Sequence, residues 1–462
     1  MSAVPAQLPP ARAFPPKAHE PLPPPLAAGS AAHRSAKWAL FVGGFAVFAM
    51  FYGPQPLLSM FGTEFDLSAA QASGVLSATA GAMALGLIPA GFLAQRYGPK
   101  PVMLSAIVLG ALCSLLCAVA PNYPSLIGLR ALLGLCLAGL PAVASAWLAE
   151  EMDAKALGQA VGLIIAGNAA GGMSSRLVCG VLADLVGWRV AFAGLGTLGA
   201  IAAFEFWRSL PASRRHRPRP LHPRHALADL RSVFSERGLV PLFALALLLM
   251  GSFVSFYNYL GFRLVQAPFA LSHATIGAIF LLYVVGMFSS PWAGHRADRL
   301  GSSRVLAWML ALCAAGLVLT LSNALPVIVV GVALFTFGFF AAHSVASSWV
   351  GRLAQRSKAL ASAVYLTAYY LGASSMGWLG GHAWQAGAWT GVLAFLALLW
   401  LGAVAIALRL ARLPAPPSTI ERARRSAATA VAVDCLDAPG HANRATAAGP
   451  QCAAPASRLR RH

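Results

Sequence analysis

Twelve long apolar stretches divide the chain, and hardly any charged residue falls inside them. A run of about 20 apolar residues is what a helix needs to cross the roughly 30 Å hydrocarbon core of a bilayer. The sequence therefore predicts an all-α, polytopic membrane protein whose surroundings are the lipid bilayer. The predicted spans are residues 38–60, 72–94, 102–120, 124–148, 158–180, 189–207, 239–262, 274–294, 304–322, 325–349, 359–381 and 389–410.

The positions of the basic residues predict the orientation of the spans. The formal net charge is +20, and all but four of the 34 Lys and Arg residues lie in the two tails, the central loop and the loops on that same side. The positive-inside rule places this side, and both termini, in the cytoplasm. Because no aromatic pattern or motif accompanies the basic loops, we expect no nucleic-acid partner. The four remaining cations are Arg130, Arg176, Arg189 and Arg263.

Composition divides the chain into five segments. Residues 1–36 are rich in proline and predict a disordered cytoplasmic tail, and residues 412–462 predict a second, basic one. Residues 37–208 and 239–411 each contain six spans and predict two six-helix bundles. Residues 209–238 between them form a basic cytoplasmic linker.

The two halves repeat the same landmarks at nearly constant spacing. The loop after the second span, residues 90–98, matches the loop after the eighth span, residues 293–301, in its glycines and its arginine. A duplicated helical unit is typical of transporters, whose substrate site lies where the repeats meet. The predicted gating-loop residues are Gly91, Gln95, Arg96, Gly98 and Lys100 in the first half and Gly294, Asp298, Arg299 and Gly301 in the second.

This repeated Gly-x-x-x-Asp-Arg-x-Gly pattern resembles the signature loop of the major facilitator superfamily, and the resemblance runs from the first span to the last. Asp298 keeps the family's acidic residue, whereas Gln95 replaces it. The resemblance implies twelve transmembrane helices in two pseudo-symmetric bundles that move a small molecule by alternating access. It also implies a monomer in the cytoplasmic (inner) membrane of a bacterium.

Two further pieces resemble one branch of that family, the twelve-span drug:proton antiporters and sugar-efflux proteins. Arg130 with Gly134 resembles its buried-arginine motif, and residues 167–172 resemble its antiporter motif with Asn168 in place of proline. The resemblance implies proton-coupled efflux. Uptake by a symporter or facilitator on the same fold remains an alternative, as does a membrane sensor that binds its ligand without moving it.

Gly167, Gly171 and Gly172 remove side chains along one side of the fifth span, which lets another helix approach closely. Close packing alone and a bending role in gating both fit this pattern.

Arg130 is the main candidate for a cavity residue. It lies about six residues into its span, about 9 Å deep by helical rise, where a charge is costly unless it faces water or a partner. An arginine that extends to the membrane surface is the alternative. The other predicted cavity residues, each of which also suits an interhelical hydrogen bond, are Tyr52, Gln55, Asn168, Tyr257, Asn258, Tyr283, Tyr365 and Tyr369.

His343 is the candidate for proton coupling, because none of the fourteen Asp and Glu residues lies near mid-membrane. A histidine titrates near neutral pH, so it can gain and lose a proton within one transport cycle. A histidine that only bonds to a neighbouring helix is the alternative. One cavity cation without a cavity acid favours an anionic or neutral substrate over a cation.

The sequence lacks the usual patterns of an enzyme. It shows no phosphate-binding loop with lysine, no pair of metal ligands on a helix and no nucleophile motif with a base. We therefore expect no catalytic residue, no cofactor and no metal.

Overall fold

The computed structural model describes residues 23–27, 29–216, 223–354 and 358–412. Residues 1–22 and 28 of the predicted tail 1–36, and residues 413–462 of the predicted tail 412–462, lie outside these ranges. The helices of the first half are α1 (Ala31–Tyr52), the short 3-10 turn η1 (Gln55–Leu57), α2 (Leu58–Glu64), α3 (Ala69–Tyr97), α4 (Pro99–Ala118), α5 (Tyr123–Leu137), α6 (Gly139–Glu151), α7 (Ala154–Val186) and α8 (Trp188–Ser209). Those of the second half are α9 (Pro223–Ser235), α10 (Leu239–Val265), α11 (His273–Ile279), the 3-10 turn η2 (Phe280–Leu282), α12 (Tyr283–Leu300), α13 (Ser302–Leu319), α14 (Leu325–Leu353) and α15 (Lys358–Ala411).

The predicted all-α membrane fold is confirmed. Eleven helical segments of the described residues are long and apolar enough to cross a bilayer. The last of them, within α15, has non-helical backbone at Gly387 and Ala388, so it contains two of the predicted spans. The described chain therefore holds the twelve predicted crossings.

Several crossings are broken helices, and proline explains the first break. Pro54 and Pro56 have no backbone N–H to donate to the preceding turn. The helix accordingly stops at Tyr52, passes through η1 and resumes as α2. The predicted fourth span is interrupted at Ala138, and the predicted eighth span by η2.

The repeated loops form the same tight turn in both halves. Gly98 ends α3 and begins α4 with φ 94°, and Gly301 ends α12 and begins α13 with φ 89°. Their N–H groups donate to Ala94 O at 2.9 Å and to Ala297 O at 3.0 Å. Only glycine adopts such a positive φ without strain, which explains why both copies of the repeat have glycine at this position.

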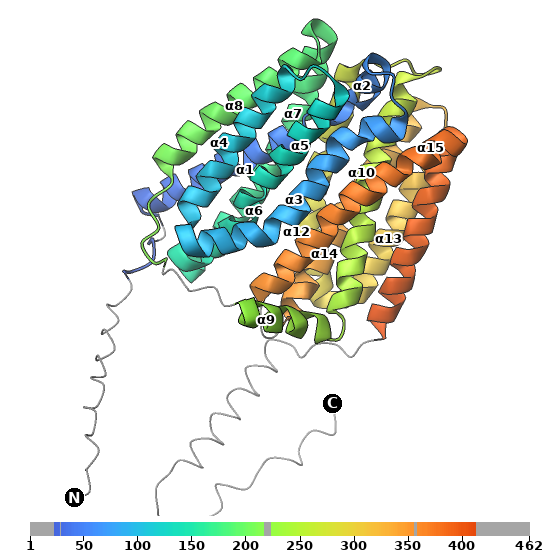
Figure 1. Ribbon diagram of the computed structural model, residues 1–462. Coiled ribbons are helices and arrows are strands. Elements are labelled where there is room, and N and C mark those ends of the chain that lie inside the picture. Colours follow the sequence, from blue (N-terminus) through green and yellow to red (C-terminus); the bar gives the residue numbers. More distant parts are fainter. Residues whose placement is uncertain (1–22, 28, 217–222, 355–357, 413–462) are drawn as a thin grey trace, which may run out of the picture. The chain divides into compact units, whose positions relative to one another are not determined.

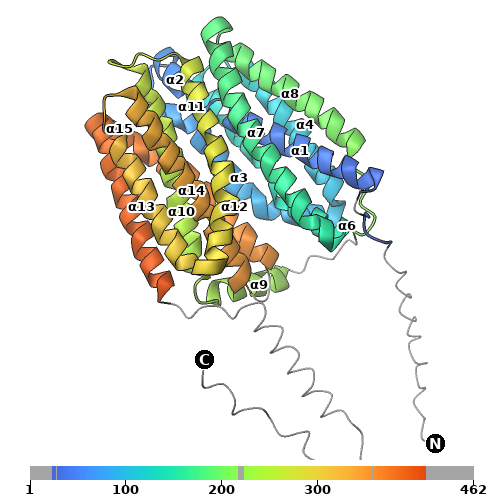
Figure 2. The same ribbon diagram turned by 180° about the vertical axis from the view of Figure 1, so that it is seen from behind.

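The two halves pack against each other through two helix pairs. Helix α3 lies along the first part of α15 (Figure 1), and α7 lies beside α11 (Figure 2). Helices α2 and α9 mark opposite ends of the bundle (Figure 1); these are called the α2 end and the α9 end below.

Ordered structure extends into two segments that were predicted as tail and linker. Helix α1 begins at Ala31, inside the predicted tail 1–36, because Ser30 caps it by accepting a bond from His33 N at 3.1 Å. Upstream, Leu26 N donates to Glu151 O at 2.7 Å. The predicted linker 209–238 contains the helix α9. Helical structure therefore begins within the residues predicted as a tail, and the residues predicted as a linker include a helix.

Candidate functional site

A buried arginine lies where the two halves meet. Arg176 in α7 is only 1% exposed. Its guanidinium carbon lies 4.3 Å from the ring centre of Tyr52 in the first half. The ring centres of Phe280 and Tyr283 in the second half lie 4.6 and 4.8 Å away. Aromatic faces attract a cation at such distances, so rings from both halves enclose one positive charge. Arg176 and these three rings are called the Arg176 cluster.

A chain of side-chain hydrogen bonds links Arg176 to the second half. Arg176 Nε donates to Gln55 Oε1 at 2.7 Å, and Gln55 Nε2 donates to Asn258 Oδ1 at 2.8 Å. Gln55 belongs to the 3-10 turn that the two prolines impose, which aims its side chain inward. Arg176 Nη1 also donates to Gly172 O at 2.5 Å, one turn earlier in its own helix.

No acid compensates the charge of Arg176 within the described residues: it forms no ion pair with Asp or Glu there. Its close neighbours from both halves are instead the aromatic rings of Tyr52, Phe280 and Tyr283. Removing a charge from water without an opposite charge is costly. The cluster is therefore a place where a small anion would be stabilised.

Arg130 in α5 has a different role. It is completely buried, and its Nε, Nη1 and Nη2 donate to the carbonyls of Val75, Met50 and Phe51 at 3.1, 2.9 and 2.6 Å. In an unbroken helix the Met50 carbonyl would accept from residue 54, which is a proline and has no N–H. Arg130 supplies the missing donor, so its contacts hold the broken first span and do not reach the Arg176 cluster.

The predicted proton-coupling residue lies in a second polar group between α14 and α15. Tyr365 Oη lies 3.0 Å from His343 Nδ1, and the rings of His343 and Tyr369 have centres 4.6 Å apart. Nearby, Tyr257 Oη lies 2.7 Å from Thr336 Oγ1. The structure thus brings most of the predicted tyrosines to the middle of the fold, around two polar groups.

Asn168 and the predicted packing glycines face α1. A side chain on Gly167 or Gly171 would meet the carbonyls of Phe41 or Phe45. The side-chain oxygen of Asn168 is buried in the same seam and has no hydrogen-bond partner in the described structure. Gly167, Gly171 and Asn168 therefore set the distance between α1 and α7, whereas Gly172 lies against Arg176 and Tyr52.

The predicted gating loops lie toward the α9 end and bond mainly within their own halves. Asp298 Oδ1 lies 3.5 Å from Arg352 Nη1 in the second half. In the first half, Lys100 Nζ donates to Trp207 O at 3.0 Å, and the Gln95 carbonyl lies 3.2 Å from His216 Nε2. A side chain on Gly91 or Gly294 would meet open space. The guanidinium of Arg96 lies over the ring of Tyr97, and Arg299 lies in the last turn of α12.

A polar contact at the α2 end also joins the halves. Asp184 Oδ2 accepts from Ala274 N at 2.7 Å, and Asp184 Oδ1 lies 2.8 Å from His273 Nδ1. His273 Nε2 lies 3.3 Å from Ser59 Oγ. Sequence reasoning missed this contact, because nothing in the pattern of either half shows which residues meet across the interface.

Sequence reasoning also did not single out Arg176 as a candidate site residue. The signal was present, since Arg176 is a cation within a span that carries no neighbouring acid, as Arg130 is. The sequence pattern does not show which neighbours the guanidinium group of each arginine faces in the fold.

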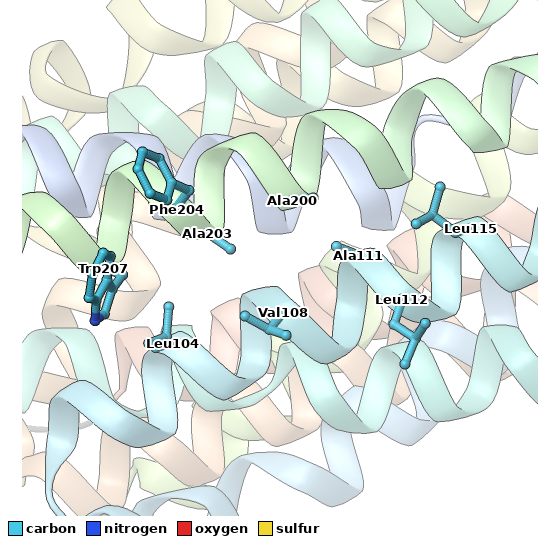
Figure 3. Close-up of a pocket in the computed structure, with 9 residues that line it drawn as sticks. All are labelled: Leu104, Val108, Ala111, Leu112, Leu115, Ala200, Ala203, Phe204 and Trp207. Atoms are coloured by element: carbon cyan, nitrogen blue, oxygen red, sulfur yellow. The ribbon is translucent and has the colours of Figure 1, made fainter.

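Two cavities in the described structure lie away from these residues. A groove of about 430 Å³ runs between α4 and α8 (Figure 3). It is lined by Leu104, Val108, Ala111, Leu112, Leu115, Ala200, Ala203, Phe204 and Trp207. A second cavity, of about 600 Å³, lies where α3, α5 and α15 adjoin. None of the predicted site residues lines either of them.

Comparisons with known proteins agree with this fold. The sequence model described as "Major Facilitator Superfamily" matches residues 40–289 and 263–447. The inner membrane transport protein YnfM of Escherichia coli (strain K12) is 42% identical over 374 residues, which cover 81% of this chain and 90% of that protein. The uncharacterized MFS-type transporter YybF of Bacillus subtilis (strain 168) is 38% identical over 384 residues, 83% of this chain and 95% of that protein.

Among solved structures, a bacterial homolog of the human lysosomal transporter Spinster, in an inward-facing and occupied conformation, superposes with a TM-score of 0.67. It is 16% identical and covers 83% of this chain and 98% of its own, so it supports the fold alone. Together with the family match and the relatives, it leads to one conclusion. The chain belongs to the major facilitator superfamily and is a multi-pass membrane transporter.

Proposed function

We propose that the protein exports a small anionic or neutral molecule across the bacterial cytoplasmic membrane in exchange for protons, as a monomer with both termini in the cytoplasm. The observation that carries this proposal is the Arg176 cluster, a buried cation enclosed by rings from both halves. A site built from both halves changes its exposure when the halves rock against each other.

The contacts between the halves support alternating access. Two side-chain hydrogen bonds join the halves on the α2 side of the cluster, one between Gln55 and Asn258 and one between Asp184 and His273. The basic linker belongs to the α9 end, which the positive-inside rule assigns to the cytoplasm. In this proposal the structure is the state that opens toward the cytoplasm, and export requires these bonds to break.

His343 is the proposed proton carrier. It lies beside Tyr365 and Tyr369, two of the tyrosines predicted to line the cavity. A neutral histidine that gains a proton changes the charge of the cavity by one unit, which is what exchange of a proton for a substrate requires.

Transport by the purified full chain in proteoliposomes tests the proposal. The solute is the one that most raises the protein's thermal stability in a screen, and the pH gradient is imposed in either direction. We expect solute to move against the proton gradient, and His343→Gln to keep solute exchange while removing its pH dependence. Movement of solute with the protons would instead identify a symporter, and binding without flux a sensor.

A further inference from the structure

The Arg176 cluster offers free hydrogen-bond donors on one side only. Nε and Nη1 of Arg176 are engaged by Gln55 and Gly172, whereas Nη2 has no acceptor among the described residues. The hydroxyls of Tyr52 and Tyr283 likewise have no hydrogen-bond partner there. The Arg176 cluster therefore holds one guanidinium edge and two phenol groups that no described residue uses as hydrogen-bond partners.

This arrangement favours a carboxylate over other anions. A carboxylate has two oxygens in one plane, and it can accept from Nη2 and from a tyrosine hydroxyl at once. A phosphate dianion carries more charge and more oxygens than the single free edge of Arg176 can match. A ligand cation would be repelled by Arg176, which no acid neutralises in the described structure.

The walls of the cluster favour a flat body on the ligand. Tyr257 and Phe280 are stacked, with ring centres 4.8 Å apart and an interplanar angle of 27°. Tyr283 packs against Tyr257 nearly edge to face at 5.2 Å. These rings pack on one another, so a ligand in the cluster would meet their remaining faces and edges, where aromatic contacts with a planar group add to simple apolar burial.

We propose that the Arg176 cluster binds the carboxylate of a small aromatic acid, with Arg176 and the hydroxyls of Tyr52 and Tyr283 on the carboxylate and the neighbouring rings on its flat body. This assignment of substrate class rests on the proposed function, because it takes the cluster to be the transport site.

Ligand-dependent thermal unfolding of the purified full-length protein tests the substrate class. The probes are benzoate, its saturated analogue cyclohexanecarboxylate, its neutral analogue benzamide, the cation benzylammonium and phenylphosphonate. A ligand that binds only the folded state raises the unfolding temperature, and at equal concentration a ligand of higher affinity raises it more. We expect benzoate to raise it most, cyclohexanecarboxylate less, and the other three little or not at all.

Three variants locate the binding. Arg176→Gln should weaken benzoate binding about tenfold or more, since it removes a charged hydrogen bond. Tyr283→Phe keeps the ring and loses a hydroxyl that has no protein partner, so it should fold normally and weaken benzoate binding by a smaller factor. The control is Arg208→Gln, which removes an exposed arginine paired with Glu205 at the surface; it should bind benzoate like the parent.

Two results would overturn the assignment: no benzoate stabilisation of the parent protein, or equal benzoate affinity in the parent, Arg176→Gln and Tyr283→Phe. These results are distinct from a failure of the proposed function. Binding in detergent needs no proton gradient, so a protein that binds benzoate through Arg176 without moving solute in proteoliposomes refutes export and keeps the binding site.

Discussion

Two buried arginines show how one residue type serves two purposes in this protein. Arg130 gives its three donor nitrogens to backbone carbonyls, whereas Arg176 keeps one nitrogen free beside aromatic rings from both halves. Depth in the membrane made Arg130 the stronger candidate from sequence. The hydrogen bonds of the two guanidinium groups make Arg176, and not Arg130, the stronger candidate for a residue that binds the substrate.

The two arginines should respond differently to the same substitution. Arg130→Met removes three bonds to carbonyls, and a hydrogen bond to a charged group contributes about 1.5–3 kcal/mol. We expect a clear drop in thermal unfolding temperature. Arg176→Met relieves an uncompensated buried charge, so it should cost less stability and yet abolish transport. Unfolding curves and proteoliposome flux, measured on both variants, check this; equal loss of stability with flux kept in Arg176→Met would contradict it.

The sequence could predict which residues of the candidate site are polar and lie in the spans, but it could not predict which of them meet. Tyr52, Gln55, Asn258 and Tyr283 are polar residues in apolar spans, a local property that hydropathy reveals, and the structure brings all four to Arg176 or to its hydrogen-bond chain. Which of them face one another depends on helix rotation and on contacts between the halves. Those are tertiary properties, and a single sequence does not encode them in its periodicity.

At the scale of elements, the seam between α1 and α7 depends on glycines. A side chain on Gly171 would collide with the carbonyl of Phe45, while Gly162 in the same helix has open space around it. Gly171→Ala should therefore lower the unfolding temperature and the transport rate, because α1 and its broken segment must shift. Gly162→Ala is the matched control, and its better helix propensity, about 1 kcal/mol, should leave stability equal or higher. Equal stability of the two variants would show that the packing of α1 on α7 does not require glycine at position 171.

The gating loops give a second prediction at this scale. Asp298 pairs with Arg352 on the neighbouring helix of its own half, and such exposed pairs contribute about 0–1 kcal/mol. That is small for folding but enough to bias two states separated by a few kcal/mol. We expect Asp298→Asn to lower turnover more than stability and to change the balance between the two states. Gln95→Asp should change much less. Equal labelling of cavity cysteines from the cytoplasmic side, in the parent and in Asp298→Asn, would rule out this bias.

The whole molecule is predictable to the extent that it is built from repeated local patterns. The apolar spans and the matching glycine turns at Gly98 and Gly301 follow from hydropathy and backbone stereochemistry, so twelve crossings in two halves could be expected. The early start of α1 and the helix α9 in the linker do not follow from the hydropathy of the spans, because α1 begins at its Ser30 cap and α9 packs on α10 and α15.

The central claim is that Arg176 binds the substrate where the halves meet and that binding shifts the halves between two states. Distances between paired spin labels test it most directly, in a protein whose native cysteines have been replaced. One pair, at Thr63 and Gln266, spans the α2 end, and the other, at Tyr97 and Arg304, spans the α9 end; the side chains of Thr63, Gln266, Tyr97 and Arg304 are exposed.

Benzoate should lengthen the distances between Thr63 and Gln266 and shorten those between Tyr97 and Arg304, and it should change neither in Arg176→Gln. A ligand shifts an equilibrium only through its different affinity for the two states, so the response must depend on the residue that binds it. Distances that stay the same with benzoate, or that change equally in the parent and in Arg176→Gln, would contradict the account.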